Sequence, residues 1–255
     1  MRPKGTTPRF GAPHRHYART DSTNTRAREL AAAGAPHGTV VTATEQTEGR
    51  GRQGRAWTAP PGKALLYSAI LRPLGERALL PLAVPLAVCE AVEALQPGVE
   101  CRVKWPNDVQ VGGRKLAGIL IEARPRDDWA VIGVGLNLTI ESDEFPPELR
   151  DTATSLAMVA QGWDPATRGM ASPRPLHLQN ARLALDAHLT RWTEEADEAV
   201  LAAWRERDAL HGREVAWDGG SGVADGVDDR GNLVVATPGA GRIALGAGEV
   251  HLTGV

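Results

Sequence analysis

The chain has 255 residues, of which 42% are hydrophobic, and a formal net charge of −2 at pH 7. This composition allows a sizeable core in one or two domains and argues against a dedicated nucleic-acid-binding protein, which would be basic. The two cysteines, Cys89 and Cys101, lack metal-ligand spacing, so we expect reduced thiols and a cytoplasmic protein. We expect no membrane span, because the apolar run 78–89 is short and contains Pro81 and Pro85. We expect no signal peptide, because the N-terminal residues lack an apolar core.

The N-terminal segment is basic and poor in large apolar groups. Residues 1–20 carry five lysines and arginines and no acidic residue, which predicts that most of this segment is a poorly ordered tail. The polar run Asp21-Ser22-Thr23-Asn24 follows and precedes a predicted helix. The hydroxyls of Ser22 and Thr23 could simply cap that helix. Alternatively, together with Asn24, they face a polar ligand.

Hydrophobic spacing predicts helices and strands in alternation, with glycine and proline marking their ends. The elements expected in chain order are a helix at 25–33, strands at 38–44 and 64–71, a helix at 77–95, a strand at 101–105, a hairpin of 109–111 and 115–122 around Gly112-Gly113, a strand at 129–138, a helix at 154–161, a loop at 162–175 and two helices within 176–210. From Gly212 the pattern changes to short strands separated by turns, which predicts a small closed or half-closed β-barrel.

The stretch Gly49-Arg50-Gly51-Arg52-Gln53-Gly54-Arg55, followed by Trp57, is the most unusual in the chain. Arginine presents a fixed cation and a planar fork of donors that suits phosphate or carboxylate. Glycine lets the backbone approach a ligand and exposes its N–H groups. We expect such a loop to be mobile when empty and ordered by an anionic ligand. Taken alone, such a run is usually a solvated basic loop or a nucleic-acid patch.

Five stretches together resemble the biotin protein ligase family, over roughly residues 15 to 255. They are Asp21-Ser22-Thr23-Asn24, the run from Gly49 to Trp57, Lys104-Trp105-Pro106-Asn107-Asp108, the run from Arg114 to Glu122, and Gly133-Val134-Gly135-Leu136-Asn137. The chain departs from the family pattern in two ways. Gln53 stands where some members have another arginine. Bifunctional members also carry an N-terminal DNA-binding domain, which we do not expect here.

The resemblance implies an α+β catalytic domain at 15–208, with a mixed sheet and helices on one side. A flexible tail at 1–14 would precede it, and a small SH3-like barrel at 209–255 would follow. It implies activation of biotin by ATP, with Mg²⁺, to biotinyl-5′-AMP and pyrophosphate. Biotin then passes to a lysine of a biotin carboxyl carrier protein domain. Neither DNA nor a membrane is expected as a partner, and the oligomeric state, including a homodimer, is left open.

The resemblance also implies roles for single residues. Lys115 would bind the biotin carboxylate and the activated acyl oxygen, Arg52 and Arg55 would lie near the phosphates, and Trp57 would stack on adenine or merely anchor the loop. Asp108 would hold Mg²⁺, position Lys104 or act as the base for transfer, and Glu122 would act in support of the site or only structurally. The remaining implied contacts are Ser22, Thr23, Asn24, Gln46, Arg50, Gly51, Arg52, Gly133 and Gly135 to biotin, and Lys104, Asn107 and Asn137 to ATP.

The sequence leaves three rival functions to distinguish. A lipoate or octanoate ligase or transferase has related chemistry, but it should lack the glycine–arginine loop and the Lys-Trp-Pro-Asn-Asp motif. A biotin-sensing repressor is disfavoured by the acidic net charge. A non-catalytic biotin-binding module would be distinguished by the absence of ATP turnover.

Overall fold

The computed structural model describes residues 9–160, 178–239, 241–246, 248 and 250–252. Its helices are α1 (Thr23–Ala32), α2 (Leu80–Leu95), α3 (Leu156–Val159), α4 (Leu178–Trp192) and α5 (Asp197–Glu206). Its strands are β1 (His14–Thr20), β2 (Val40–Gln46), β3 (Ala64–Leu71), β4 (Arg102–Lys104), β5 (Asp108–Val111), β6 (Arg114–Arg124), β7 (Trp129–Asn137), β8 (Glu214–Trp217), β9 (Gly220–Val227), β10 (Leu233–Thr237), β11 (Gly241–Leu245) and β12 (His251–Leu252).

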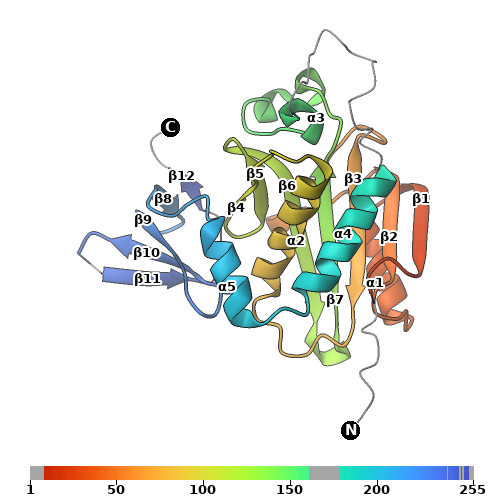
Figure 1. The fold of residues 1–255 in the computed structure, drawn as a ribbon, viewed down its shortest axis with the longest axis horizontal. Helices are drawn as coiled ribbons and strands as arrows, with labels where there is room; N and C mark the ends of the chain where they lie inside the picture. The colour runs from red at the N-terminus through yellow and green to blue at the C-terminus, as the bar shows by residue number, and fades with distance from the viewer. Residues whose placement is uncertain (1–8, 161–177, 240, 247, 249, 253–255) are drawn as a thin grey trace.

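The larger sheet has seven strands in the order β1-β2-β3-β7-β6-β5-β4 and forms the centre of the molecule (Figure 1). β1 pairs with β2 in parallel, and the other neighbouring strands pair antiparallel. The predicted hairpin joins β5 to β6 through Gly112 and Gly113, whose φ angles of 57° and 76° are those a two-residue type I′ turn requires. The expected mixed sheet is therefore confirmed.

Helices cover both faces of this sheet, so the expectation of helices on one side is wrong. Alternate residues of a strand face opposite sides. On β3, Tyr67 and Leu71 belong to the main core with α2 and α4, whereas Ile70 packs with Ala27 and Ala31 of α1. β3 is buried along its whole length because both of its faces are covered.

The N-terminal segment is more ordered than its composition suggests. Residues 1–8 lie outside the described part, but His14–Thr20 forms β1, the edge strand of the large sheet. Most of its side chains are exposed, so it is held by backbone pairing with β2 more than by a hydrophobic face. The expectation of a poorly ordered tail is therefore wrong for these residues.

The C-terminal strands form a second, five-stranded antiparallel sheet in the order β11-β10-β9-β8-β12. It lies beside α5 and the β4 edge of the large sheet (Figure 1). The indole N–H of Trp105, just after β4, donates to the carbonyl oxygen of Gly231 at 3.1 Å and links the two parts. The loop predicted at 162–175 lies outside the described residues.

The core contains several residues singled out from the sequence. Trp192 of α4 and Trp204 of α5 are buried, as expected for core tryptophans. Cys89 and Cys101 are buried free thiols. In the described part of the chain, no helix is both long enough and apolar enough to cross a lipid bilayer.

Candidate active site

A cavity lies on the α1 face of the large sheet, at the N-terminal end of that helix. Its lining comes from the start of α1, the end of β2, the glycine–arginine loop, strands β3, β6 and β7, and the segment 145–153. Leu66, Gly133 and Gly135 form part of its floor and share this face with Ile70. Segments that are distant in the sequence therefore supply one continuous surface.

One end of the cavity is polar and almost fully buried. Ser22, Thr23 and Asn24 have 3%, 4% and 4% of their surface exposed. Ser22 occupies the N-cap position of α1, yet its side chain makes no capping hydrogen bond. Gln46 Oε1 lies 2.7 Å from the backbone nitrogen of Thr23, which donates to it, and 2.9 Å from the Thr23 hydroxyl. This end thus gathers donors and acceptors suited to a compact polar ligand group.

The loop from Gly49 to Trp57 is closed by its own backbone. The Trp57 N–H donates to the Gly49 carbonyl at 2.9 Å, and the Gly51 N–H donates to the Arg55 carbonyl at 2.7 Å. A Cβ at Gly49 would lie 2.3 Å from the carbonyl oxygen of Trp57, so this position requires glycine. The exposed tip, Gln53 and Gly54, has left-handed backbone conformations.

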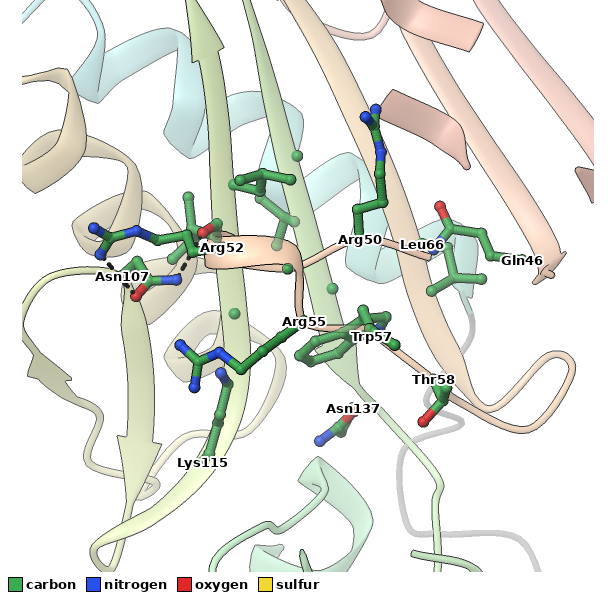
Figure 2. Close-up of a pocket in the computed structure, with 18 of the residues that line it drawn as sticks. Gln46, Arg50, Arg52, Arg55, Trp57, Thr58, Leu66, Asn107, Lys115 and Asn137 are labelled. Atoms are coloured by element: carbon green, nitrogen blue, oxygen red, sulfur yellow. Dashed lines mark hydrogen bonds between the residues drawn. The ribbon is translucent and has the colours of Figure 1, made fainter. Parts of the chain in front are cut away.

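Two of the loop arginines are tied to the body of the domain. Arg50 donates to the Thr25 hydroxyl at 3.2 Å and to Glu122 at 3.3 Å. Arg52 donates to Asn107 Oδ1 at 3.4 Å. Figure 2 shows that Arg52 points toward Asn107, while Arg50 points away from it. The loop is therefore anchored to the domain at two places. Arg50 holds it to α1 and β6, and Arg52 holds it to the segment just before β5.

Positive charge is concentrated on one side of the cavity, where Arg52, Arg55 and Lys115 all contribute to the lining. Burial lowers the pKa of the Arg52 guanidinium, Arg55 lowers it further, and Asp108 opposes both. Partly desolvated cations that repel one another gain stability when an anion arrives. This side of the cavity is thus built for phosphate or carboxylate.

Lys115 extends from the start of β6 into this positive region. Its Nζ lies 2.7 Å from Asp108 Oδ1 and 5.7 Å from the ring centroid of Trp57. The indole nitrogen of Trp57 is buried and has no hydrogen-bond partner among the described residues. An aromatic ring and a cation are therefore presented together at the cavity, whereas the indole nitrogen is buried against Gly135 of β7.

The glycines of β7 are needed for close packing of side chains. A Cβ at Gly133 would lie 2.2 Å from Asn24 Oδ1, and one at Gly135 would lie 2.3 Å from the Trp57 ring. Gly118 of β6 similarly admits Trp57, whose ring would be 3.0 Å from a Cβ there. These glycines thus seat Asn24 and Trp57 against the sheet, and direct contact of Gly133 or Gly135 with a ligand stays a prediction.

Comparison with known proteins supports a specific family. Residues 17–138 match the family model described as the Biotin/lipoate A/B protein ligase family. The chain is 36% identical to a biotin--[acetyl-CoA-carboxylase] ligase of Mycobacterium tuberculosis, over 92% of this chain and 87% of the relative. The chain belongs to the biotin protein ligase family.

Other members of the biotin protein ligase family extend this comparison. A biotin protein ligase from Aquifex aeolicus, solved in complex with biotin and ATP, superposes with a TM-score of 0.75 at 27% identity, covering 95% of this chain and 99% of that one. The bifunctional ligase/repressor of Bacillus spizizenii is 42% identical, but over only 54% of this chain. The match spans 44% of the length of that relative.

Most residues that the resemblance implicated do lie together. The cavity lining includes Ser22, Thr23, Asn24, Gln46, Arg50, Gly51, Arg52, Arg55, Trp57, Asn107, Lys115, Gly133, Gly135 and Asn137. Lys104 and Asp108 are not part of the lining; they face each other across the β4–β5 ladder. Burial lowers the pKa of the Lys104 ammonium group, whereas Asp108 raises it. Their functional roles stay predictions.

One buried polar residue of the site escaped sequence reasoning. Ser68 of β3 is 0% exposed, and its hydroxyl contacts Thr23 and Asn24. It lies in the otherwise apolar run Ala64–Leu71, whose pattern predicts only a strand. The signal that could have identified it is a serine in the middle of a strand whose other residues are almost all apolar.

We predict that the loop tip becomes protected when ligand binds. Its cations repel one another and Gln53 and Gly54 are exposed, so trypsin should cut after Arg52 or Arg55 in the free protein. Biotin with ATP should slow that cleavage about tenfold or more by mass action. Cleavage after the exposed Arg126, on the β6–β7 turn and outside the cavity lining, is the internal control and should not change. Equal cutting of the loop with saturating ligand would contradict the prediction.

Proposed function

We propose that this member of the family is an ATP-dependent biotin ligase that forms biotinyl-5′-AMP and transfers biotin to a protein lysine. One observation carries the proposal. A single cavity joins a buried polar end, formed by residues such as Thr23 and Gln46, to a cationic side formed by Arg52, Arg55 and Lys115. This layout matches a ligand that is neutral and polar at one end and anionic at the other.

The polar end suits the ureido ring of biotin. That ring has two N–H donors and one carbonyl acceptor, and each needs a partner when it is buried. We propose that Ser22, Thr23 and Gln46, with the backbone at Arg50, provide these partners. The valeryl chain would then cross the floor of the cavity and place the carboxylate near Lys115.

In the first step, a biotin carboxylate oxygen attacks the α-phosphorus of ATP, the bond to the β-phosphate oxygen breaks, and pyrophosphate leaves. Two anions must approach each other, so fixed cations are needed to stabilise the transition state. We propose that Lys115 holds the carboxylate, that Arg52 and Arg55 contact the phosphates, and that Trp57 stacks on adenine. Asn107 and Asn137 would contribute polar contacts to the nucleotide.

Magnesium would enter with the nucleotide. Among the described residues, no group of three His, Cys, Asp or Glu side chains is arranged to hold a metal ion. Mg²⁺ keeps several waters and uses few carboxylates when it accompanies phosphates. We therefore propose Mg·ATP as the substrate complex, with Asp108 as a candidate contact.

In the second step, the ε-amine of the acceptor lysine attacks the acyl carbon, and AMP leaves with the bonding electrons. The amine must lose a proton, and Asp108 is our candidate base because its carboxylate lies 2.7 Å from Lys115. We propose a biotin carboxyl carrier protein domain as the acceptor, since the relative in Mycobacterium tuberculosis is named for acetyl-CoA carboxylase. A cytoplasmic location, an SH3-like barrel for the C-terminal sheet and a homodimer are further proposals.

The proposed function is tested without any carrier protein. Purified protein with Mg·ATP should release pyrophosphate only when biotin is present, and one biotinyl-5′-AMP should remain bound per active site. Lipoate and octanoate at the same concentration serve as controls. Pyrophosphate release with lipoate or octanoate but not with biotin would indicate a lipoate or octanoate ligase, a function that the same family model also covers. No release with any acid would favour a binding protein.

We predict that Arg52→Gly makes a leaky ligase. The contact between Arg52 and Asn107 ties the loop across the cavity, and losing one charged hydrogen bond should speed release of biotinyl-5′-AMP roughly ten- to a hundredfold. Adenylate synthesis should survive in part, because Lys115 remains. Free adenylate would then acylate bystander lysines, which a biotin blot of added albumin detects. Arg126→Gly, at an exposed turn, is the matched control.

Two results would contradict this account of Arg52. If the variant made no adenylate, Arg52 would belong to the first chemical step. If it labelled only the carrier at the parent's rate, the loop would not retain the intermediate.

A further inference from the structure

The carboxylate of Glu122 lies between α1 and the glycine–arginine loop. Glu122 is on β6, on the same face of the sheet as Gly118, which lines the cavity. Its Oε1 lies 3.1 Å from Arg28 Nη1, and its Oε2 lies 2.8 Å from Asn24 Nδ2 and 3.3 Å from Arg50 Nη2. One carboxylate therefore joins two side chains of α1 to one side chain of the loop.

The two side chains of α1 fix this carboxylate independently of the loop. Asn24 is 4% exposed, and its Oδ1 accepts a hydrogen bond from Ser68 Oγ at 2.6 Å, so its NH₂ group is directed toward Glu122. Arg28 donates to the other carboxylate oxygen from the middle of the helix. Glu122 is therefore a preformed acceptor, and Arg50 is the partner whose position depends on the loop.

Arg50 is used differently from the other two arginines of the loop. Its guanidinium donates to Glu122 and, at 3.2 Å, to the Thr25 hydroxyl, so both of its partners lie outside the loop. Figure 2 shows Arg50 pointing away from Arg52 and Arg55. Pairing one of three like charges with a carboxylate lowers the repulsion that opposes closure of the loop. The other two arginines are left at the cationic side of the cavity.

We infer that the contact between Glu122 and Arg50 is a latch that holds the glycine–arginine loop closed over the cavity. Glu122 is thus a positioning residue, which acts on the ligand only through the loop. The side chain of Arg50 serves the latch, which leaves Arg52 and Arg55 for an anionic ligand. The use of the latch to retain biotinyl-5′-AMP rests on the proposed function, whereas the latch itself does not.

The test begins with Glu122→Ala in the ligand-free protein. Trypsin cleavage after Arg52 or Arg55 follows the population of the open loop, so it should become about two- to fivefold faster, the factor for losing one partly exposed ion pair. Labelled biotinyl-5′-AMP, preformed on the protein and chased with unlabelled adenylate, should leave faster by a similar factor. A merely structural role, in which β6 loosens, would also speed cleavage after Arg126, which should stay at the parent's rate.

The second variant, Arg50→Ala, removes the latch from the side of the loop and should give the same increase. The double variant Arg50→Ala/Glu122→Ala should be cut no faster than the faster single variant, because both changes remove one contact. Arg28→Ala is the matched control. Arg28 pairs with the same carboxylate and its side chain is 33% exposed, against 38% for Arg50, but it belongs to α1. It should leave cleavage of the loop at the parent's rate.

Three results would overturn the inference. They are loop cleavage at the parent's rate in Glu122→Ala, additive increases in the double variant, and an increase in Arg28→Ala equal to that in Arg50→Ala. If the parent forms no biotinyl-5′-AMP, the proposed function is wrong, and the cleavage rates of the ligand-free loop still decide whether the latch exists.

Discussion

Replacing Lys115 with alanine is expected to slow adenylate formation by roughly a hundred- to a thousandfold. Lys115 enters the cavity from the start of β6, next to Trp57 and the arginine loop. It would hold the attacking carboxylate while negative charge builds up on the phosphate. Losing one aligned, charge-assisted contact costs about 3 to 4 kcal/mol in the transition state. Folding should be spared, because the side chain is about one-third exposed.

The measurement is biotin-dependent pyrophosphate release under single-turnover conditions. Lys63→Ala is the matched control, because Lys63 is equally exposed and pairs with Glu144 at the surface, where such pairs contribute little. Asp108→Asn tests the two members of this ion pair separately, because it removes the carboxylate charge next to Lys115 but leaves the Lys115 ammonium in place. Near-normal release by Lys115→Ala would remove Lys115 from the reaction.

A second large effect is expected from Gly135→Ala. Gly135 is on β7, which is paired on both sides by β3 and β6 and cannot move aside. The added methyl group would lie 2.3 Å from the Trp57 ring, so Trp57 must leave its place. Stacking of a base on an aromatic ring contributes about 1 to 3 kcal/mol. The KM for ATP should therefore rise roughly ten- to a hundredfold, with a smaller change in the KM for biotin.

The double variant Gly135→Ala/Trp57→Ala distinguishes a lost stacking partner from general damage. Without the indole ring the clash disappears, so the thermal stability should return to that of Trp57→Ala alone. The KM for ATP should stay high in all three variants. If Gly135→Ala bound ATP as the parent does, Trp57 would be an anchor of the loop only.

Much of the fold was predictable because local signals agreed with tertiary structure. The strand at 64–71 and the Gly112-Gly113 hairpin combine β-branched or apolar runs with the required turn residues. β1 was missed because its side chains are polar or basic and mostly exposed. A parallel edge strand held by backbone hydrogen bonds leaves no hydrophobic period to detect.

The candidate site was predictable as a set of motifs but not as a geometry. Lys104 and Asp108 are in the same motif as Asn107, yet of these three residues only Asn107 lines the cavity. Asp108 reaches the cavity indirectly, through its 2.7 Å contact with Lys115 Nζ. Gly133 and Gly135 make room for Asn24 and Trp57, which the motif does not show, and their contact with a ligand stays a prediction. Which face a side chain occupies depends on pairing register, which a motif does not contain.

The central claim is that this cavity activates biotin and passes it to a protein lysine. The most direct measurement is the intact mass of a biotin carboxyl carrier domain after incubation with the protein, Mg·ATP and biotin. The account predicts one biotinyl group per carrier domain, added only when ATP is present, and none on a carrier whose acceptor lysine is replaced by arginine. An unmodified carrier, in a reaction where the protein does form biotinyl-5′-AMP, would contradict the transfer step. An unmodified carrier with no adenylate formed would contradict the claim as a whole.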